Sequence, residues 1–239
     1  MSIDKNYDGL IVFDFDGVLD LGSQEAYEYI LRETLLDSGV ELPEDEVIRR
    51  INASWGSQLS NVLRELLREH PELYPKARDV LQECLWEDFP EMIRGIPGAP
   101  EKLGELALKY SLAINTAADR KPLVGRVMPK LGIDPELFAY IFTADDINNP
   151  NEYKPEPHGL RLIMKELGFL PAQTTMVGDS DSDVLTAQFS SVEPIVVLTG
   201  NLDIEEADEL GVKYIIEDVT KIDTALGQIG LKPVLTYDA

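Results

Sequence analysis

Short apolar runs recur along the chain, separated by segments whose apolar residues repeat every three to four positions. The short runs are rich in residues that favour strands, as expected of strands buried on both faces of a parallel sheet. Segments of helical periodicity between them include Glu101–Tyr110, Leu123–Leu131 and Pro157–Leu167. The alternation predicts an α/β fold, a parallel sheet with helices on both faces. The expected strands are Leu10–Phe13, Leu112–Ile114, Tyr140–Phe142, Thr175–Val177, Ile195–Leu198 and Tyr214–Ile216.

One region breaks this alternation, because from Ser23 to about Met92 the periodicity is helical only. Three successive segments in it carry apolar stripes, which begin at Ala26, Leu59 and Ala77. A turn-rich stretch at 95–100 would then return the chain to the sheet. We therefore predict an inserted all-helical domain over residues 22–93, and a sheet domain formed by residues 1–21 and 94–239.

Composition limits the possible partners of the chain. Its 239 residues include 44 Asp and Glu against 21 Lys and Arg, a formal net charge of −23. This charge disfavours binding to nucleic acid and to anionic membrane surfaces. No apolar run approaches the ~20 residues that cross a bilayer, and no signal peptide is evident. With Cys84 as the only cysteine, a reducing compartment fits. We expect a cytoplasmic monomer or homodimer that binds neither nucleic acid nor membrane; the acidity fits a saline cytoplasm or ordinary solubility.

Two carboxylates mark the end of the first expected strand. Asp14 and Asp16 are one residue apart and are followed by Gly17. Residues i and i+2 of a strand share a face, and open α/β sheets bind ligands beyond the carboxyl ends of their strands. A carboxylate can attack phosphorus, and a second acid can protonate the leaving oxygen and later activate water. The pair therefore indicates a reactive carboxylate beside a Mg²⁺ site.

Other polar side chains follow later strands. Thr116 offers a hydroxyl to a phosphate after the second strand, and Asn115 beside it could share this binding. Lys154 is a cation whose neighbouring prolines restrict the backbone. Asp179 and Asp183 follow the strand Thr175–Val177. Phosphoryl transfer needs such a set of a nucleophile, cationic or hydroxyl donors, and a metal.

The expected metal is Mg²⁺, which takes hard oxygen ligands. Asp14, Asp179 and the backbone carbonyl of Asp16 would form the protein's share of its ligands. Asp183 is expected either to support these ligands or to cap the helix that it begins.

The order of these pieces resembles the haloacid dehalogenase-like superfamily, over nearly the whole chain. Asp14-Phe15-Asp16-Gly17-Val18-Leu19 is similar to its first motif, Thr116 to the second, Lys154 to the third, and Gly178-Asp179-Ser180-x-x-Asp183 to the fourth. The resemblance implies a Rossmann-like core with an α-helical cap, near the phosphoglycolate phosphatase and β-phosphoglucomutase group. It also implies that Asp14 is the nucleophile and Asp16 the general acid/base, which favours phosphoryl transfer over dehalogenation.

The inserted helical region holds two further candidates for substrate binding. Asn52-Ala53-Ser54-Trp55-Gly56-Ser57 is a turn between two expected helices, and Arg49 lies just before it. If this loop faces the site, Trp55 could stack on the leaving group and an arginine could pair with an anion. The alternative is a hinge with Trp55 packed inside the cap.

We predict a Mg²⁺-dependent phosphatase that hydrolyses a small phosphorylated metabolite through an aspartyl-phosphate intermediate. A phosphomutase and a pyrophosphatase use the same motifs and stay as alternatives. A binding or scaffold protein that keeps the fold without turnover is the alternative outside enzymes. The presence of Asp14, Asp16, Lys154 and Asp179 argues against it, because their loss would leave folding largely intact.

Overall fold

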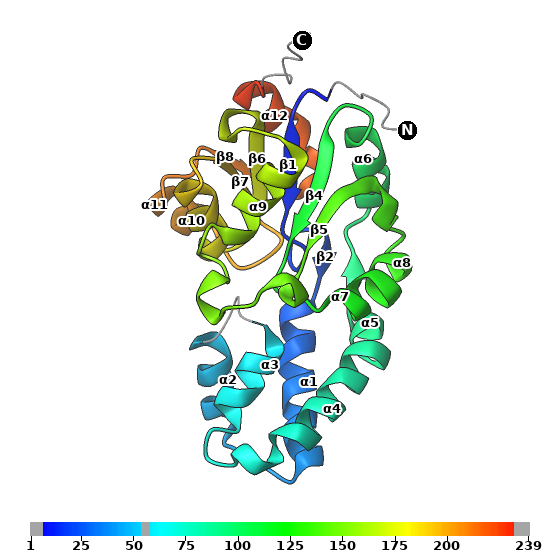
Figure 1. Cartoon of the computed structure of the whole chain (residues 1–239), viewed down its shortest axis with the longest axis vertical. Helices are drawn as coiled ribbons and strands as arrows, with labels where there is room; N and C mark the ends of the chain where they lie inside the picture. Colours follow the sequence, from blue (N-terminus) through cyan, green and yellow to red (C-terminus); the bar gives the residue numbers. More distant parts are fainter. Residues whose placement is uncertain (1–6, 54–57, 232–239) are drawn as a thin grey trace.

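The computed structural model describes residues 7–53 and 58–231, and its centre is a six-stranded parallel sheet (Figure 1). The strand order is β5-β4-β1-β6-β7-β8. Each strand overlaps a run predicted from the sequence, so the predicted α/β fold class is confirmed. The strands are β1 (Leu10–Phe13), β4 (Ser111–Asn115), β5 (Phe138–Phe142), β6 (Thr174–Gly178), β7 (Glu193–Val197) and β8 (Tyr214–Ile216).

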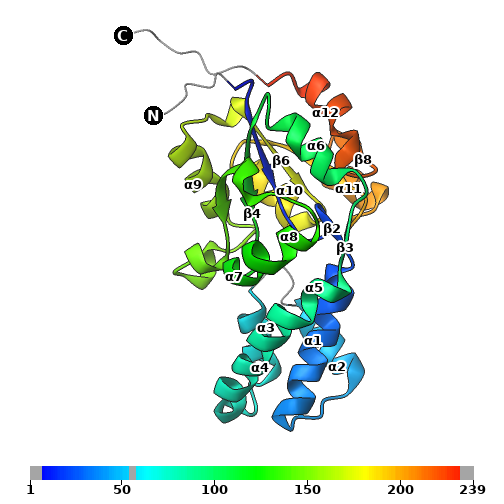
Figure 2. The same ribbon diagram turned by 90° about the vertical axis from the view of Figure 1, so that its right-hand side faces the viewer.

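Helices cover both faces of the sheet because the strands alternate their side chains. Leu10 and Val12 of β1 pack towards α9 and α10, whereas Ile11 and Phe13 pack towards the opposite layer. Figure 2 shows α9 and α6 on opposite sides of the strands. One layer contains α9 (His158–Leu167), α10 (Asp181–Phe189) and α11 (Ile204–Glu209). The other contains α6 (Ala99–Leu106), α7 (Arg120–Pro122), α8 (Met128–Lys130) and α12 (Ile222–Ile229).

Short helical turns complete the connections between these elements. A π-helical turn, Leu123–Val127, joins α7 to α8. This turn and α8 correspond to the helix predicted at 123–131. The 3₁₀ turns are Pro71–Leu73, Pro135–Leu137, Ala144–Asp146, Pro150–Glu152, Pro171–Gln173 and Val219–Lys221.

Between Leu21 and Arg94 the described chain forms five α-helices, which we call the helical insert (residues 22–93). Two short strands flank it, β2 (Asp20–Leu21) and β3 (Arg94–Gly95), and they pair antiparallel. Gly39 adopts φ 83° and closes the first helix with bonds from its N–H to the carbonyls of Leu35 and Leu36. The helices are α1 (Ser23–Ser38), α2 (Glu44–Ala53), α3 (Leu59–Leu66), α4 (Tyr74–Glu87) and α5 (Phe89–Met92).

The apolar stripes of the helical insert pack against one another. Ile30 and Leu31 of α1 belong to the same buried cluster as Leu81 and Leu85 of α4. That cluster continues into the sheet layer formed by α6 and α8, for example at Leu103. The insert thus shares its apolar core with one face of the sheet, and its separation as a domain stays a prediction.

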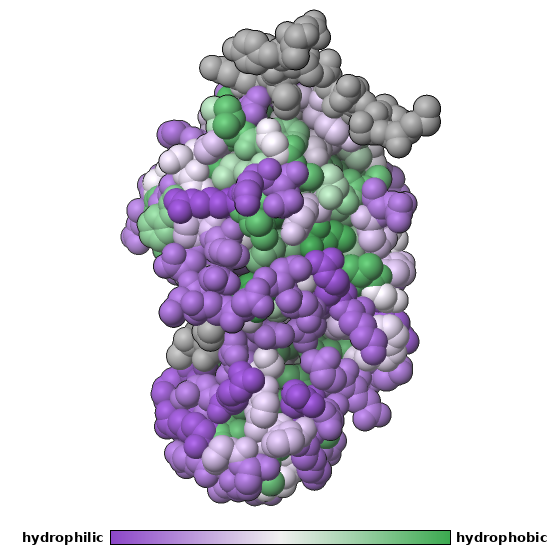
Figure 3. Space-filling view, in the orientation of Figure 1, coloured by the Kyte–Doolittle hydropathy of each residue, from purple (hydrophilic) through white to green (hydrophobic). Residues whose placement is uncertain are grey.

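The outer surface of the helical insert is polar. On the face drawn in Figure 3, hydrophilic residues cover most of the insert. Among the described residues, every helix is too short or too polar to cross a membrane.

Candidate active site

Three strands of the sheet end level with one another, and each is followed by a candidate side chain. In the parallel ladders Phe13 of β1 lies opposite Ile114 of β4 and opposite Val177 of β6. The register brings Asp14, Thr116 and Asp179 to the same edge of the sheet, at the carboxyl ends of the strands. These residues are buried, and all three line one cavity.

Lys154 joins this edge from the loop before α9. Its Nζ lies 2.8 Å from Oδ1 of Asp14 and 2.7 Å from Oδ1 of Asp183, and all three side chains are almost fully buried. Burial disfavours the charged lysine, but the two carboxylates hold the pKa of Lys154 above its usual value. Lys154 is therefore an ammonium ion that crosslinks the nucleophile candidate to the fourth motif.

Asp183 has two structural roles. It is the third residue of α10, and Ser180 at the N-cap bonds reciprocally with it in a capping box. Its Oδ2 accepts hydrogen bonds from the hydroxyl of Ser180 at 2.6 Å and from two backbone N–H groups. Its Oδ1 accepts a hydrogen bond from Lys154. The side chain of Asp183 thus takes part in the cap of α10 and contacts Lys154, and its support of metal ligands stays a prediction.

Asp179 is held between two glycine backbones. A Cβ on Gly200 would lie 1.8 Å from Oδ2 of Asp179, and one on Gly17, which has φ +74°, would lie 2.6 Å from it. The same oxygen accepts hydrogen bonds from the backbone N–H (2.9 Å) and side-chain amide (2.8 Å) of Asn201. Both bonds fix Oδ2, and no described residue donates a hydrogen bond to Oδ1. The side chain is thus oriented by one oxygen and offers the other as a ligand.

The balance of charge at this edge is strongly negative. Burial, together with the charge of Asp183, raises the pKa of Asp14 to about 6 even though Lys154 lowers it. Burial and the charges of Asp183 and Asp14 raise the pKa of Asp179 to about 8. One buried ammonium cannot offset so many buried carboxylates. The site therefore favours a further cation or bound protons.

The donor set fits Mg²⁺. Asp14, Asp179 and Asp183 each offer a carboxylate oxygen, and these atoms lie within 4.8 Å of one another. Hard carboxylate oxygens are the usual protein ligands of Mg²⁺. A divalent cation would also supply the missing positive charge. Both the ligand type and the charge of the three carboxylates therefore fit Mg²⁺.

Asp16 has different surroundings. Its two carboxylate oxygens lie 3.0 and 3.1 Å from the hydroxyl of Tyr27 on α1, which donates the hydrogen bond. Burial, then the charges of Asp20 and Asp14, raise the pKa of Asp16 well above its usual value. Asp20 is itself buried, accepts a hydrogen bond from the N–H of Gly17 at 2.9 Å, and has a pKa raised to about 7, chiefly by burial. A raised pKa is the direction of shift that a general acid needs.

A cavity of about 600 Å³ lies between this edge and the helical insert. Asp14, Asp16, Thr116 and Lys154 line it from the sheet side. The insert contributes an apolar wall, and the flanking strands β2 and β3 contribute Leu21 and Arg94. Arg94 is a cation for which the described residues provide no ion pair. The apolar wall of the insert consists of Ile51, Leu59, Val62, Leu85, Phe89 and Met92.

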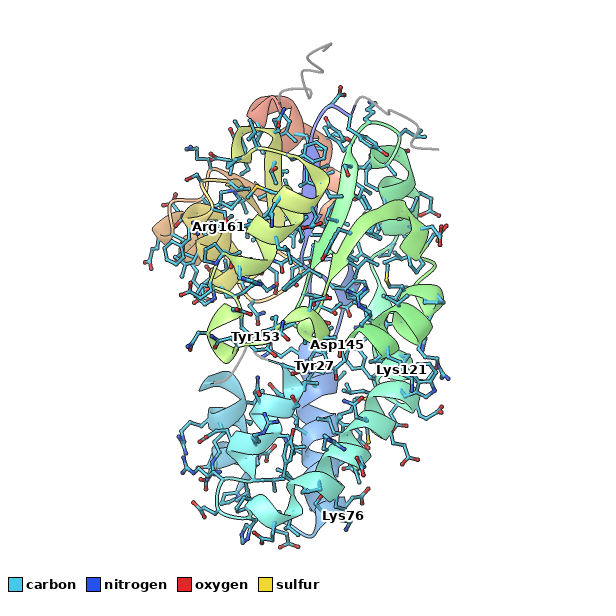
Figure 4. All side chains as sticks on the ribbon, in the orientation of Figure 1. Tyr27, Lys76, Lys121, Asp145, Tyr153 and Arg161 are labelled. Atoms are coloured by element: carbon cyan, nitrogen blue, oxygen red, sulfur yellow. The ribbon has the colours of Figure 1, made fainter. Side chains whose placement is uncertain are left out.

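Hydrogen bonds tie the insert to the sheet domain beside this cavity. Asp119, just after Thr116, accepts bonds from the side-chain amides of Gln58 (2.6 Å) and Gln82 (2.9 Å). The hydroxyl of Tyr153 donates to Gln58 at 3.1 Å. Figure 4 labels Tyr27 and Tyr153 where the insert meets the sheet, whereas Lys76 lies at the far end of the insert.

The structure does not bring every candidate to the cavity. Arg49 is 65 % exposed, pairs with Glu46 at 3.7 Å and is absent from the cavity wall. Asn115 is buried, but its side chain points towards α9, where a Cβ on Gly159 would lie 2.5 Å from its Oδ1. Trp55 lies outside the described residues.

Sequence reasoning missed Asn201 and Tyr27. Asn201 could have been found, because it follows the strand β7 at the same edge of the sheet. Tyr27 lies in an apolar helical stripe, and the sequence carries no sign that its hydroxyl reaches Asp16.

A parallel sheet with an aspartate cluster and a lysine at its carboxyl edge defines a class of metal-assisted α/β enzymes. The family model for haloacid dehalogenase-like hydrolases matches residues 11–197. The chain belongs to this family, so the predicted family and its phosphatase class of enzyme are confirmed.

Relatives and solved structures agree with this assignment. The chain is 33 % identical to a phosphoglycolate phosphatase of Rhodospirillum rubrum, over 95 % of this chain and 97 % of the relative. It is 25 % identical to the pyrophosphatase PpaX of Oceanobacillus iheyensis, over 91 % and 96 %. A hydrolase from Pseudomonas syringae has the same fold, with a TM-score of 0.72 at 24 % identity over 92 % of this chain and 99 % of that one.

Proposed function

We propose that this protein is a Mg²⁺-dependent phosphatase that hydrolyses a small phosphate monoester through an aspartyl-phosphate on Asp14. The observation that carries the proposal is the buried ion pair of Asp14 with Lys154 at 2.8 Å, within a cluster of three carboxylates of which Asp14 and Asp179 line the cavity. A carboxylate fixed by a lysine at the wall of a cavity has the position of a nucleophile rather than of a surface acid.

Each side chain at the edge has a role in this reaction. Asp14 attacks phosphorus in line, and Lys154 places a positive charge beside the transferring group. The hydroxyl of Thr116 accepts from the N–H of Ala118 at 3.2 Å, which leaves its own proton to donate to a phosphate oxygen. Asp14, Asp179, Asp183 and the Asp16 carbonyl would hold Mg²⁺, which offsets phosphate charge when bound.

Asp16 is the proposed general acid and base. As the bond from phosphorus to the ester oxygen breaks, the proton of Asp16 goes to the leaving alkoxide. The resulting carboxylate then takes a proton from the water that attacks phosphorus of the aspartyl-phosphate, which releases inorganic phosphate and restores Asp14.

The helical insert is the proposed cap, and residues 22–93 the proposed cap domain. It closes the cavity from the side opposite the catalytic carboxylates, so that the leaving group contacts its apolar wall and Arg94. Exclusion of bulk water by such closure strengthens the electrostatic interactions inside. The phosphomutase, pyrophosphatase and scaffold alternatives, the oligomeric state and the cytoplasmic location stay predictions.

The test is phosphate release from a panel of phosphate monoesters that includes phosphoglycolate and hexose phosphates, with pyrophosphate beside them, in Mg²⁺ or EDTA. We expect turnover of at least one monoester in Mg²⁺, its loss in EDTA, and its loss in Asp14→Asn. Asp181→Asn is the matched control, because Asp181 carries the same carboxyl on the exposed side of α10. Preference for pyrophosphate would favour the pyrophosphatase alternative. Folded wild type without release from any compound would contradict the proposal.

A further inference from the structure

Asp16 is held from outside the sheet. It is partly exposed at the cavity, and its hydrogen-bond partner is Tyr27 of the helical insert, at 3.0 and 3.1 Å from the two oxygens. Asp14, Asp179 and Asp183 take their partners from the sheet domain instead. Within residues 7–53 and 58–231, Asp16 is the carboxylate of this set that accepts a hydrogen bond from the insert.

Tyr27 is itself fixed within the insert. Its side chain is 7 % exposed and belongs to the buried stripe of α1, beside Ala26 and Ile30. Its ring stacks on Phe89 of α5, with ring centroids 4.4 Å apart and planes 10° apart. A phenol held by a stacked ring and a packed helix has little freedom, so its hydroxyl defines where the carboxyl group of Asp16 can lie.

The chemistry of the contact suits an acid. A phenol hydroxyl carries one proton and donates one full hydrogen bond, and a protonated carboxyl group has one oxygen that accepts. Tyr27 can therefore bond to the bare oxygen and leave the proton of the other oxygen to be donated to the leaving group. Both residues line the cavity, so this arrangement directs the proton into it.

We propose that Tyr27 is a positioning residue for the general acid, so that proton donation by Asp16 depends on the seating of α1 against the sheet domain. This role rests on the proposed phosphatase function. It links the closure of the insert to one chemical step, because displacement of α1 removes the partner of Asp16 and leaves Asp14 and Lys154 in place.

The alternative is that Tyr27 only fills space between α1 and α5. Tyr27→Phe separates the two roles, since phenylalanine keeps the ring, its volume and the stack on Phe89 but removes the hydroxyl. The matched control is Tyr29→Phe, which removes a hydroxyl from the same helix at a side chain that is 49 % exposed.

The experiment compares two leaving groups. An alkoxide needs a proton as it departs, whereas p-nitrophenolate leaves readily without one. Because kcat/KM reports the steps up to phosphoryl transfer to Asp14, it excludes the later role of Asp16 as a base. The substrates are p-nitrophenyl phosphate and the alkyl phosphate monoester that wild type hydrolyses fastest, both in saturating Mg²⁺.

For Tyr27→Phe we expect kcat/KM to fall about tenfold or more on the alkyl ester, a part of the 10²–10⁴ that a general acid supplies. On p-nitrophenyl phosphate we expect kcat/KM of Tyr27→Phe to change less than about twofold, because its leaving group does not need a proton from a general acid. Tyr29→Phe should match wild type on both substrates.

Equal losses on both esters, or no loss on either, would overturn the positioning role while leaving the phosphatase intact. Wild type that hydrolyses neither ester would overturn the proposed function and, with it, this role.

Discussion

The carboxyl edge of the sheet and the facing wall of the helical insert border the same cavity but are built differently. At the edge, Asp14, Lys154, Asp183 and Asp179 are buried and joined to one another or to nearby backbone by short contacts. The wall of the insert is mainly apolar, and beside the cavity its polar contacts to the sheet domain include side-chain bonds with Asp16, Asp119 and Tyr153.

This difference separates two tasks. A rigid, charged edge keeps reacting groups in place, which preorganised catalysis requires. An apolar wall made of side chains from another part of the chain can differ in shape between substrates while that edge stays the same. The comparison therefore predicts that changes at the edge abolish chemistry, whereas changes at the insert alter substrate binding or one step.

The largest effect is expected for Lys154→Met. Removing the ammonium leaves Asp14 and Asp183 without their shared cation, and breaking a buried ion pair costs about 3–5 kcal/mol. We expect kcat to fall roughly 10²-fold or more, as for loss of a preorganised donor, with a lower melting temperature in EDTA that Mg²⁺ partly restores. Phosphate release and thermal unfolding measure the two effects.

The control for that variant is Lys165→Met, which removes an exposed lysine from α9. It should leave both activity and stability near wild type. Near-normal turnover in Lys154→Met would show that the edge tolerates loss of its cation. This result would contradict the prediction that changes at the edge abolish chemistry.

The next effect is expected for Gly200→Ala. The new Cβ would lie 1.8 Å from Oδ2 of Asp179, so the carboxylate must move from the site. We expect Mg²⁺ affinity to fall about 10–100-fold, the range for loss of support to a metal ligand, measured by the Mg²⁺ dependence of phosphate release and by calorimetry.

Gly104→Ala is the comparison for the glycine change, because nothing lies within 4 Å of the added methyl group in α6. Unchanged Mg²⁺ affinity in Gly200→Ala would mean that Asp179 is not a ligand in the position seen here.

Removal of metal should make stability depend on pH. The pKa values of Asp14 and Asp179, raised to about 6 and about 8, exceed those of unfolded aspartates, so the folded protein binds more protons. Stability contributed by these protons is present at low pH and is lost as pH rises through the folded pKa values. In EDTA we expect the melting temperature to be a few degrees lower near pH 8.5 than near pH 6, since about 1 kcal/mol corresponds to a few degrees.

Mg²⁺ should reverse this trend, because it binds the deprotonated carboxylates and stabilises most at the higher pH. Calorimetric scans at both pH values with and without Mg²⁺ test the point. A metal-free melting temperature that rises from pH 6 to pH 8.5 would contradict the assignment.

The smallest effect is expected on the side of the insert, for Gln82→Ala. The variant removes one of the two amide bonds to Asp119 and leaves the edge untouched. Intramolecular hydrogen bonds contribute about 0.5–1.5 kcal/mol, and this one is exposed, so KM should rise at most a few-fold with kcat nearly constant. Steady-state kinetics on the best substrate measure this, with Glu83→Ala as an exposed control on α4. A loss of kcat as large as that of Lys154→Met would erase the distinction between the two regions.

Much of the edge could be predicted from local sequence. Strand residues are recognised by apolar runs, and Asp14, Thr116, Asp179 and Lys154 stand out as polar residues at or after the ends of such runs. The parallel register then brings these residues to one edge, because the carboxyl ends of β4, β1 and β6 lie side by side. The predicted family and fold class were confirmed for this reason.

The sequence by itself thus determined the sheet, the position of the insert in the chain and the candidates for nucleophile, acid, cation and metal ligands. The tertiary structure decided which of them meet: it placed Lys154 on Asp14, turned Asp16 towards Tyr27, and left Arg49 in solvent and Asn115 facing α9. The physical reason is the separation along the chain of the residues that interact. Periodicity and strand ends are local properties, whereas contact between a helical insert and a strand end depends on packing among residues far apart in the chain.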